Sequence, residues 1–149
     1  MNLSYAAGFI DGEGCIGFTQ CRGRLVPRLL VTNTDLPILQ EFQSKFGGRI
    51  QKGTRTKTVK SHWKQCFHWV LTGTKAVDFC DKISNKLKIK LRQAQCLFAF
   101  SAIQPGKGGK WDKDGIEACK LLSDQIHWLN KKGIHNDPEP VQVVLEQRG

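Results

Sequence analysis

The sequence predicts an α+β fold built on an antiparallel sheet. The strand-like segments come in neighbouring pairs, and each pair is followed by a stretch with helical periodicity. Strands that follow one another in hairpins pair antiparallel, whereas a parallel sheet needs a crossover between consecutive strands. The clearest strand signal is at 62–72, where Trp63, Phe67 and Trp69 share one face and polar side chains share the other. No segment resembles a linker, so we expect a single domain over 1–149.

The expected order is helix, two strands, helix, two strands and then further helices. A short opening helix over 3–10 is expected to stop at Asp11-Gly12-Glu13-Gly14, because glycines terminate helices and permit unusual backbone angles. We expect a core over about 3–105, a helical segment over about 112–133 and an irregular tail over 134–149. The remaining expected elements are strands 15–21 and 25–32, a helix ending at Phe46, strands 49–57 and 62–72, a helix from Thr74, a helical stretch 91–102 and a final helix 114–132.

Local signals support the boundaries around the second helix. Thr34-Asp35-Leu36-Pro37 predicts its start, with a capping oxygen followed by proline in the first turn. Leu39 and Phe42 belong to its buried stripe, and Gly47-Gly48 ends it. In the preceding strand Pro27 predicts an edge position or a bulge, since proline has no N–H for the ladder.

The composition favours a nucleic-acid partner. The formal net charge is +10, and a field of that sign attracts polyanions. An anionic membrane surface is the second candidate, but no apolar run reaches the roughly 20 residues of a spanning helix, and no segment has the order of a signal peptide. The hydrophobic content of 40% is enough for a core. The six cysteines include no CxxC pair, so we expect reduced thiols rather than a zinc site or a disulfide framework.

The opening helix combines small residues with an acidic end. Ala6, Ala7 and Gly8 would let a second helix backbone approach closely, with Phe9 and Ile10 at the margins. If a second copy packs there, the acidic ends lie side by side, and neighbouring carboxylates are tolerated when divalent cations bind between them. The alternative is an ordinary buried helix whose acids cap a turn.

The nine residues from Ala6 to Gly14, AAGFIDGEG, resemble the signature of the LAGLIDADG homing endonucleases. Leu3 and Tyr5 upstream and the strand-like Cys15–Phe18 downstream agree with it, as does the expected element order. The resemblance covers about residues 3–105, and the last helix is compatible with it. It implies an αββαββα core with a saddle-shaped antiparallel sheet and C-terminal helices. It also implies a site-specific DNA endonuclease that makes a double-strand break at a long target by metal-dependent phosphodiester hydrolysis.

The resemblance further implies the roles of single residues. Glu13 stands at the position of the metal-binding carboxylate, where the family usually has Asp, and the carbonyl of Gly12 is the second metal ligand. Mg²⁺ is the expected ion, and Mn²⁺ or Ca²⁺ fits the same donors. Asn33 matches a polar residue that touches the nucleophilic water. Lys90, with Lys88 beside it, matches a lysine near the scissile phosphate.

Two other positions bear on the site. Asp11 is assigned to the helix end and its turn rather than to the ions. Pro37 stands where relatives often carry a basic residue, so one electrostatic contribution is missing from the pattern.

Only one copy of the motif occurs in the sequence, whereas cutting both DNA strands needs two sites. The resemblance therefore implies a homodimer and a roughly palindromic target. The compartment it implies is intracellular, with an intron reading frame of an organelle, prokaryote or phage as the origin, and with no membrane partner and no small-molecule cofactor. The predicted dimer contacts are Ala6, Ala7, Gly8, Phe9 and Ile10.

The open faces of the strand pairs are the candidate DNA surface, because a two-stranded ribbon fits the major groove. Arginine can read guanine there, and glutamine can read adenine. The candidates are polar or basic residues on these faces, at the hairpin turn or in the glycine-rich loop 105–110: Thr19, Cys21, Arg22, Arg24, Arg28, Gln51, Arg55, Lys57, His62, Lys64, His68, Lys107 and Lys110.

Two other functions stay open at the level of the sequence. One is a nucleic-acid-binding protein of the same fold that does not cut, such as an intron maturase or a DNA-binding regulator. The other is a basic RNA-binding module, which predicts stacking aromatic residues on the open faces. Trp63, Phe67 and Trp69 are instead expected on the core side, which disfavours the RNA-binding module.

Overall fold

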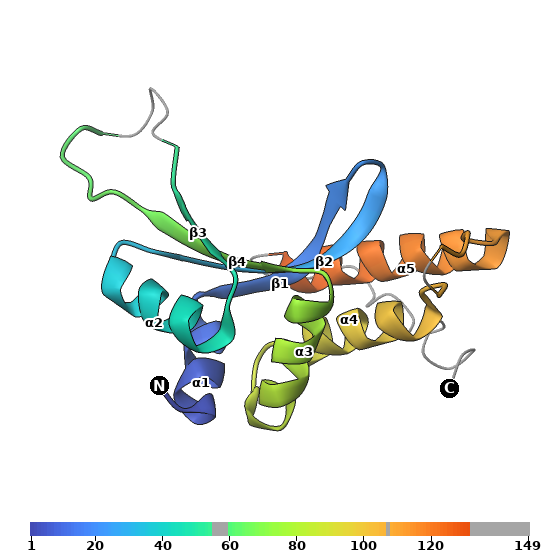
Figure 1. The fold of residues 1–149 in the computed structure, drawn as a ribbon, viewed down its shortest axis with the longest axis horizontal. Coiled ribbons are helices and arrows are strands. Elements are labelled where there is room, and N and C mark those ends of the chain that lie inside the picture. The colour runs from blue at the N-terminus through green and yellow to red at the C-terminus, as the bar shows by residue number, and fades with distance from the viewer. Residues whose placement is uncertain (55–59, 107, 132–149) are drawn as a thin grey trace.

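The computed structural model of the chain describes residues 1–54, 60–106 and 108–131. Within these residues a four-stranded antiparallel sheet is covered on one face by helices, and its two hairpins rise on opposite sides of the other face, which gives a saddle (Figure 1). The predicted α+β class is confirmed. The elements are α1 (Leu3–Glu13), β1 (Gly14–Cys21), β2 (Arg24–Asn33), α2 (Leu36–Phe46), β3 (Arg49–Lys52), β4 (Phe67–Thr72), α3 (Thr74–Ile83), η1 (Ser84–Lys86), α4 (Leu91–Ile103) and α5 (Lys113–Asn130).

The strand order is β1-β2-β4-β3, with every neighbouring pair antiparallel. The strand β2 is therefore central and its register with β1 is continuous through Pro27, so the expectation of an edge strand or a bulge at Pro27 is wrong. Proline is tolerated there because the ladder between β2 and β4 ends at Arg28 and Thr72, one residue before Pro27 needs a partner on that side. The Pro27 carbonyl accepts the N–H of Gly73 instead.

The core lies between the sheet and the helices, and Trp69 is at its centre. Its side chain has no exposed surface and is in contact with the rings of Phe42, Phe46 and Phe79. The Trp69 indole Nε1 donates to the Gly47 carbonyl at 2.8 Å, which satisfies the one polar atom of the buried ring. The aromatic face predicted for this strand is confirmed at Trp69.

The second strand pair is shorter than predicted. The strand β3 ends at Lys52 and β4 begins only at Phe67, so Trp63 lies in the connecting arm with 52% of its surface exposed. The reason is visible in Figure 1, where this arm extends past the helices that cover the sheet. Without a helix layer beneath it, an alternating sequence has no core in which to bury its apolar face.

Helix α1 is longer than predicted and continues through Gly12 to Glu13. One glycine inside a helix costs only about 1 kcal/mol relative to alanine, so Gly12 alone does not end it. The helix ends where the Gly14 N–H donates to the Ile10 carbonyl and the chain turns into β1. A Cβ on Gly14 would lie 2.8 Å from the Ile10 carbonyl oxygen, so this tight exit requires glycine.

Helix α5 lies along the outer edge of β1. The Asn130 side chain donates to the Ile16 carbonyl at 2.9 Å, and Leu122 and Ile126 are buried in the core. This bond occupies a backbone acceptor of the edge strand at Ile16. No helix in the described part of the chain is both long and apolar enough to cross a membrane.

All six cysteines lie in described residues and are free. Burial raises the pKa of the Cys80 thiol to about 12 and that of Cys96 to about 11, so both stay protonated at neutral pH. Cys15, Cys21 and Cys66 are exposed.

Candidate active site

The C-terminal end of α1 presents the predicted metal ligands. Glu13 is exposed in the last turn of the helix, and Gly12 beside it is exposed as well. Gly14 follows directly as the first residue of β1 and pairs with Val31, two residues before Asn33. The strand register therefore brings the acidic end of α1 next to the end of β2.

A third segment reaches the same place. The Asp11 carboxylate accepts backbone N–H groups from Lys88, Ile89 and Lys90, at 2.7, 3.1 and 3.0 Å. The Lys90 ammonium in turn donates to the Asp11 carbonyl. This places Lys90 at the end of α1 as a half-buried cation, while Lys88 is exposed beside it.

Asn33 has a local partner in this structure. Its Oδ1 accepts the N–H of Asp35 at 2.9 Å, so the oxygen holds the turn before α2. Asp35 itself caps α2 through the N–H of Ile38, as predicted for this helix start. The role of Asn33 toward a water stays a prediction, and its amide NH₂ is the group available for that role.

Sequence reasoning missed Thr32, whose hydroxyl is 2.8 Å from Nδ1 of His68. These two half-buried residues face each other in the ladder between β2 and β4, directly beside Asn33. No sequence signal identifies the pair, because it depends on the register of strands that are 36 residues apart.

The donors at the end of α1 fit a hard divalent cation. A carboxylate and a backbone carbonyl at a helix C-terminus are oxygen ligands at the negative end of the helix dipole. Among the described residues no group of three or more His, Cys, Asp or Glu side chains could hold a metal ion. One chain therefore supplies a partial shell, which suits Mg²⁺ because that ion keeps waters and takes the rest of its ligands from phosphates.

The structure shows which residues of α1 are buried within their own chain. Ala6, Ala7 and Ile10 have no exposed surface and pack in the core of their own chain, so the prediction that they contact a partner helix is wrong. They face the sheet because the apolar side of an amphipathic helix turns toward the larger apolar surface. Gly8 is exposed and Phe9 half-buried, so both remain available to a partner.

The outward face of α1 instead carries Tyr5, Gly8 and Gly12. Tyr5 is 51% exposed, and a Cβ on either glycine would meet nothing within 4 Å. Gly8 and Gly12 are four residues apart and therefore lie one above the other on the helix. The small residues that the chain leaves open are thus the two glycines rather than the alanines.

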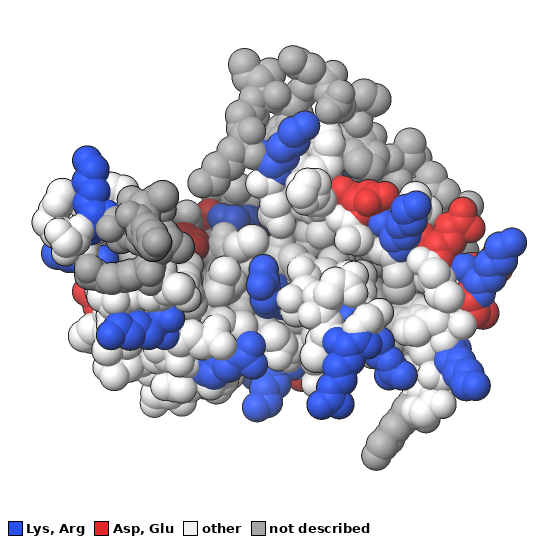
Figure 2. Space-filling model, turned by 90° about the horizontal axis from the view of Figure 1, so that it is seen from above, with Lys and Arg blue, Asp and Glu red and all other residues white. Residues whose placement is uncertain are grey.

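The open face of the sheet gathers several predicted DNA-contacting residues around one hollow. Figure 2 looks onto this face, where Lys and Arg side chains are spread widely and most Asp and Glu side chains gather toward one margin. Arg49 and Thr72 also line the hollow and were not predicted, although Arg49 is two residues from Gln51 and so shares its face. The lining residues are Thr19, Arg28, Leu30, Arg49, Gln51, His68, Val70 and Thr72.

The other predicted DNA contacts are placed outside this hollow. Cys21, Arg22 and Arg24 are exposed at the tip of the β1–β2 hairpin, where the positive φ angles of Arg22 (50°) and Gly23 (74°) form a two-residue turn. Three further candidates, Arg55, Lys57 and Lys107, lie outside the described residues. His62 and Lys64 are exposed on the arm before β4 rather than on a strand face, and Lys110 is exposed in the loop before α5.

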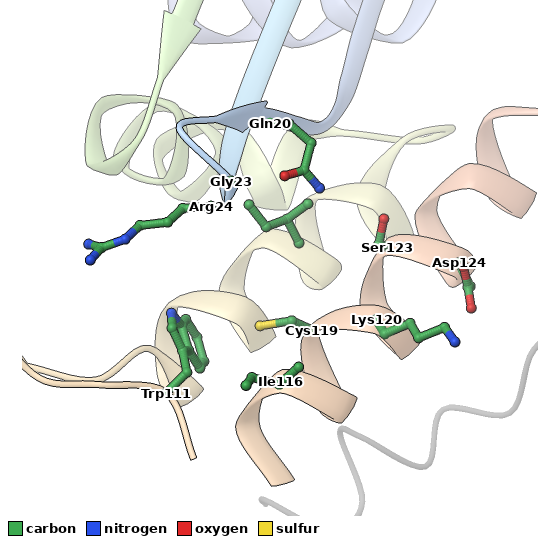
Figure 3. A pocket seen from close by; sticks show the side chains of 10 residues that line it. Gln20, Gly23, Arg24, Trp111, Ile116, Cys119, Lys120, Ser123 and Asp124 are labelled. Atoms are coloured by element: carbon green, nitrogen blue, oxygen red, sulfur yellow. The ribbon is translucent and has the colours of Figure 1, made fainter. Parts of the chain in front are cut away.

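A separate hollow lies between the β1–β2 hairpin and α5 (Figure 3). Trp111, Ile116 and Cys119 give it an apolar side, while Arg24 and Lys120 extend from it in opposite directions. Gln20 in its lining is six residues along β1 from Gly14, which corresponds to about 20 Å of strand. This hollow is therefore distinct from the acidic end of α1.

The chain was compared with known families, curated sequences and solved structures. No family model and no curated protein sequence matches the chain. Solved structures do match, among them the homing endonuclease I-CvuI in complex with its target, with a TM-score of 0.69 at 19% identity over 97% of this chain and 90% of that chain. The archaeal intron-encoded homing endonuclease I-Vdi141I, complexed with DNA, matches with a TM-score of 0.66 at 20% identity over 97% and 92%.

The LAGLIDADG meganuclease I-AabMI, bound to uncleaved DNA, has a TM-score of 0.60 at 16% identity, over 94% of this chain but 54% of that chain. At these identities the likeness establishes the fold. The chain therefore has the fold of the LAGLIDADG homing endonucleases, and the expected αββαββα architecture is confirmed.

Proposed function

We propose that this protein is a site-specific DNA endonuclease that acts as a homodimer and uses Mg²⁺ to hydrolyse phosphodiester bonds. One observation carries the proposal: Glu13 is exposed in the last turn of α1, the Lys90 ammonium donates to the Asp11 carbonyl of the same turn, and the chain then enters the first strand of a sheet whose open face is rich in Lys and Arg. Two solved structures that match this chain, I-CvuI with its target and I-Vdi141I with DNA, are homing endonucleases, which supports double-stranded DNA as the partner.

Each group at this site has a role in the proposed reaction. Glu13 and the carbonyl of Gly12 would hold the ion, and Mg²⁺ when bound would lower the pKa of a water and offset charge on the phosphate. Lys90 would stabilise the negative charge that grows on the phosphate oxygens. The amide NH₂ of Asn33 would orient the attacking water without deprotonating it, since an amide is not a base.

The dimer is proposed through the outward face of α1. Glycine inside a helix costs about 1 kcal/mol relative to alanine, and the packing of this chain does not require it at Gly8 or Gly12. Glycines four residues apart let a second helix backbone approach closely, so a contact outside the chain explains them. Two α1 helices packed there would bring two Glu13 carboxylates together, one for each DNA strand, and would match a roughly palindromic target.

The test uses the insertion-site DNA, made by joining the two flanks of the intron or other inserted element that carries the coding sequence, as a double-stranded probe. We expect both strands to be cut with Mg²⁺ and neither with EDTA, and affinity to fall steeply with salt because phosphate contacts release counterions. Tight binding without cutting would overturn the endonuclease proposal and favour a DNA-binding protein of this fold, such as a maturase or regulator.

Substitution Gly8→Arg tests the dimer. An arginine at the centre of the interface would bury an unpaired charge, so we expect the dimer Kd to rise at least about 100-fold. Analytical ultracentrifugation measures the dissociation, and circular dichroism should show an intact fold because this position faces open space. Gln95→Arg on the exposed surface of α4 adds the same charge and should leave the dimer unchanged. Equal Kd values for both variants would place the interface elsewhere.

A further inference from the structure

Asp11 links the end of α1 to the segment 88–90, which is 77 to 79 residues away in sequence. Its Oδ2 accepts the N–H of Lys88, and its Oδ1 accepts the N–H groups of both Ile89 and Lys90. The Lys90 ammonium returns a hydrogen bond to the Asp11 carbonyl. Side chain and backbone of each partner are therefore bonded to the other.

These bonds join the last turn of α1 to the residues that lead into α4. Lys90 is the N-cap residue of α4 and makes no side-chain capping bond. The Asp11 carboxylate accepts the N–H of this N-cap residue and those of the two residues before it, and bonds from N–H groups to an ionised carboxylate are stronger than neutral ones. At the other end, the Asp11 carbonyl lies in the last turn of α1, where a lysine is a favourable partner.

The link also determines where the Lys90 charge sits. Asp11 is two residues before Glu13 on the same helix, so the carboxylate that binds metal and the cation share one rigid support. An ammonium group has three N–H donors. The bond to the Asp11 carbonyl uses one of them and leaves two for phosphate oxygens. Ile89 is 70% exposed between the two lysines, so apolar packing of its side chain does not hold this segment in place.

We propose that Asp11 is a positioning residue, which holds Lys90 against the end of α1 so that its ammonium faces the phosphate at the metal site. The expected effect on cleavage rests on the proposed nuclease function. The anchoring of segment 88–90 by Asp11 does not depend on cleavage. Asp11 acts through Lys90 and through the backbone of 88–90 and takes no part as a metal ligand.

The experiment combines two measurements on Asp11→Asn. An asparagine keeps one acceptor oxygen and replaces the other with an NH₂ group, which cannot accept a backbone N–H. Amide hydrogen exchange should therefore accelerate at 88–90 by at least about tenfold, because opening of this segment becomes easier. Single-turnover cleavage of the flank-derived DNA should slow by about 10- to 100-fold with its affinity nearly unchanged, as for other residues that orient a catalytic group. Asp78→Asn, at an exposed position of α3, is the matched control and should change neither.

A double-mutant cycle with Lys90→Ala separates positioning from a general structural effect. On the Lys90→Ala background, Asp11→Asn should slow cleavage by less than about twofold, because the group that it positions is gone. An equal slowing on both backgrounds, or unchanged exchange at 88–90, overturns the proposal. If the wild-type protein binds but does not cut, the nuclease function fails separately, and the exchange result alone then decides whether Asp11 holds the segment.

Discussion

Glu13→Gln is expected to abolish DNA cleavage while leaving DNA affinity within a few-fold of the wild type. The substitution keeps the size of the side chain and removes the charge that holds a divalent cation. Loss of metal-assisted chemistry of about 4 kcal/mol corresponds to a slowing on the order of 10³-fold. Single-turnover cleavage in Mg²⁺ and binding in Ca²⁺, measured on the same probe, check the two halves of this expectation.

The matched control is Glu117→Gln, on an exposed position of α5. It removes the same charge at a distance from the acidic end of α1, and cleavage should be unchanged. Glu13→Asp should remain active, because a shorter carboxylate keeps both oxygen ligands. If the Glu13→Gln protein cuts at the wild-type rate, Glu13 is not needed for cleavage.

Trp69→Ala is expected to lower the free energy of unfolding by about 3–5 kcal/mol, the range for deleting a large buried aromatic side chain. The ring is fully buried among Phe42, Phe46 and Phe79, so its loss leaves a cavity, and the Gly47 carbonyl loses its partner. Urea unfolding at one fixed protein concentration measures the change, because association would otherwise contribute to the stability.

Trp63→Ala is the control within the same segment of sequence. Trp63 lies on the arm with 52% of its surface exposed, so its removal should cost about 1 kcal/mol or less. If both substitutions lower the free energy of unfolding by a similar amount, the arm is packed as tightly as the core. That result would support the longer strand that the alternation predicts.

Local patterns in the sequence determined most of the architecture. The cap at Asp35, the paired strands and the buried stripe with Leu39 and Phe42 all appear in the structure. These signals depend on neighbouring residues and on helical or strand periodicity, which tertiary contacts reinforce here. The motif also led to Glu13 at the end of α1, because a nine-residue pattern specifies a position regardless of its surroundings.

The predictions that were wrong depend on which part of the protein packs against a segment, and a local sequence pattern does not contain that information. The alternation at 62–72 predicts one strand. Only Phe67–Thr72, the part that helices cover, forms β4. Ala6 and Ala7 look like interface residues because they are small, yet small residues also suit close packing within one chain. The choice between the two faces of α1 depends on where the sheet lies.

The sequence alone therefore determined the order of elements, the basic character of the chain and the acidic end of its first helix. Tertiary structure decided which face of α1 stays open, where β4 begins and which residues surround Glu13. The bonds from Asp11 to 88–90 belong to this second group, since they join segments almost 80 residues apart. The physical reason is that periodicity and capping are local, whereas the meeting of two distant segments depends on the packing of the whole core.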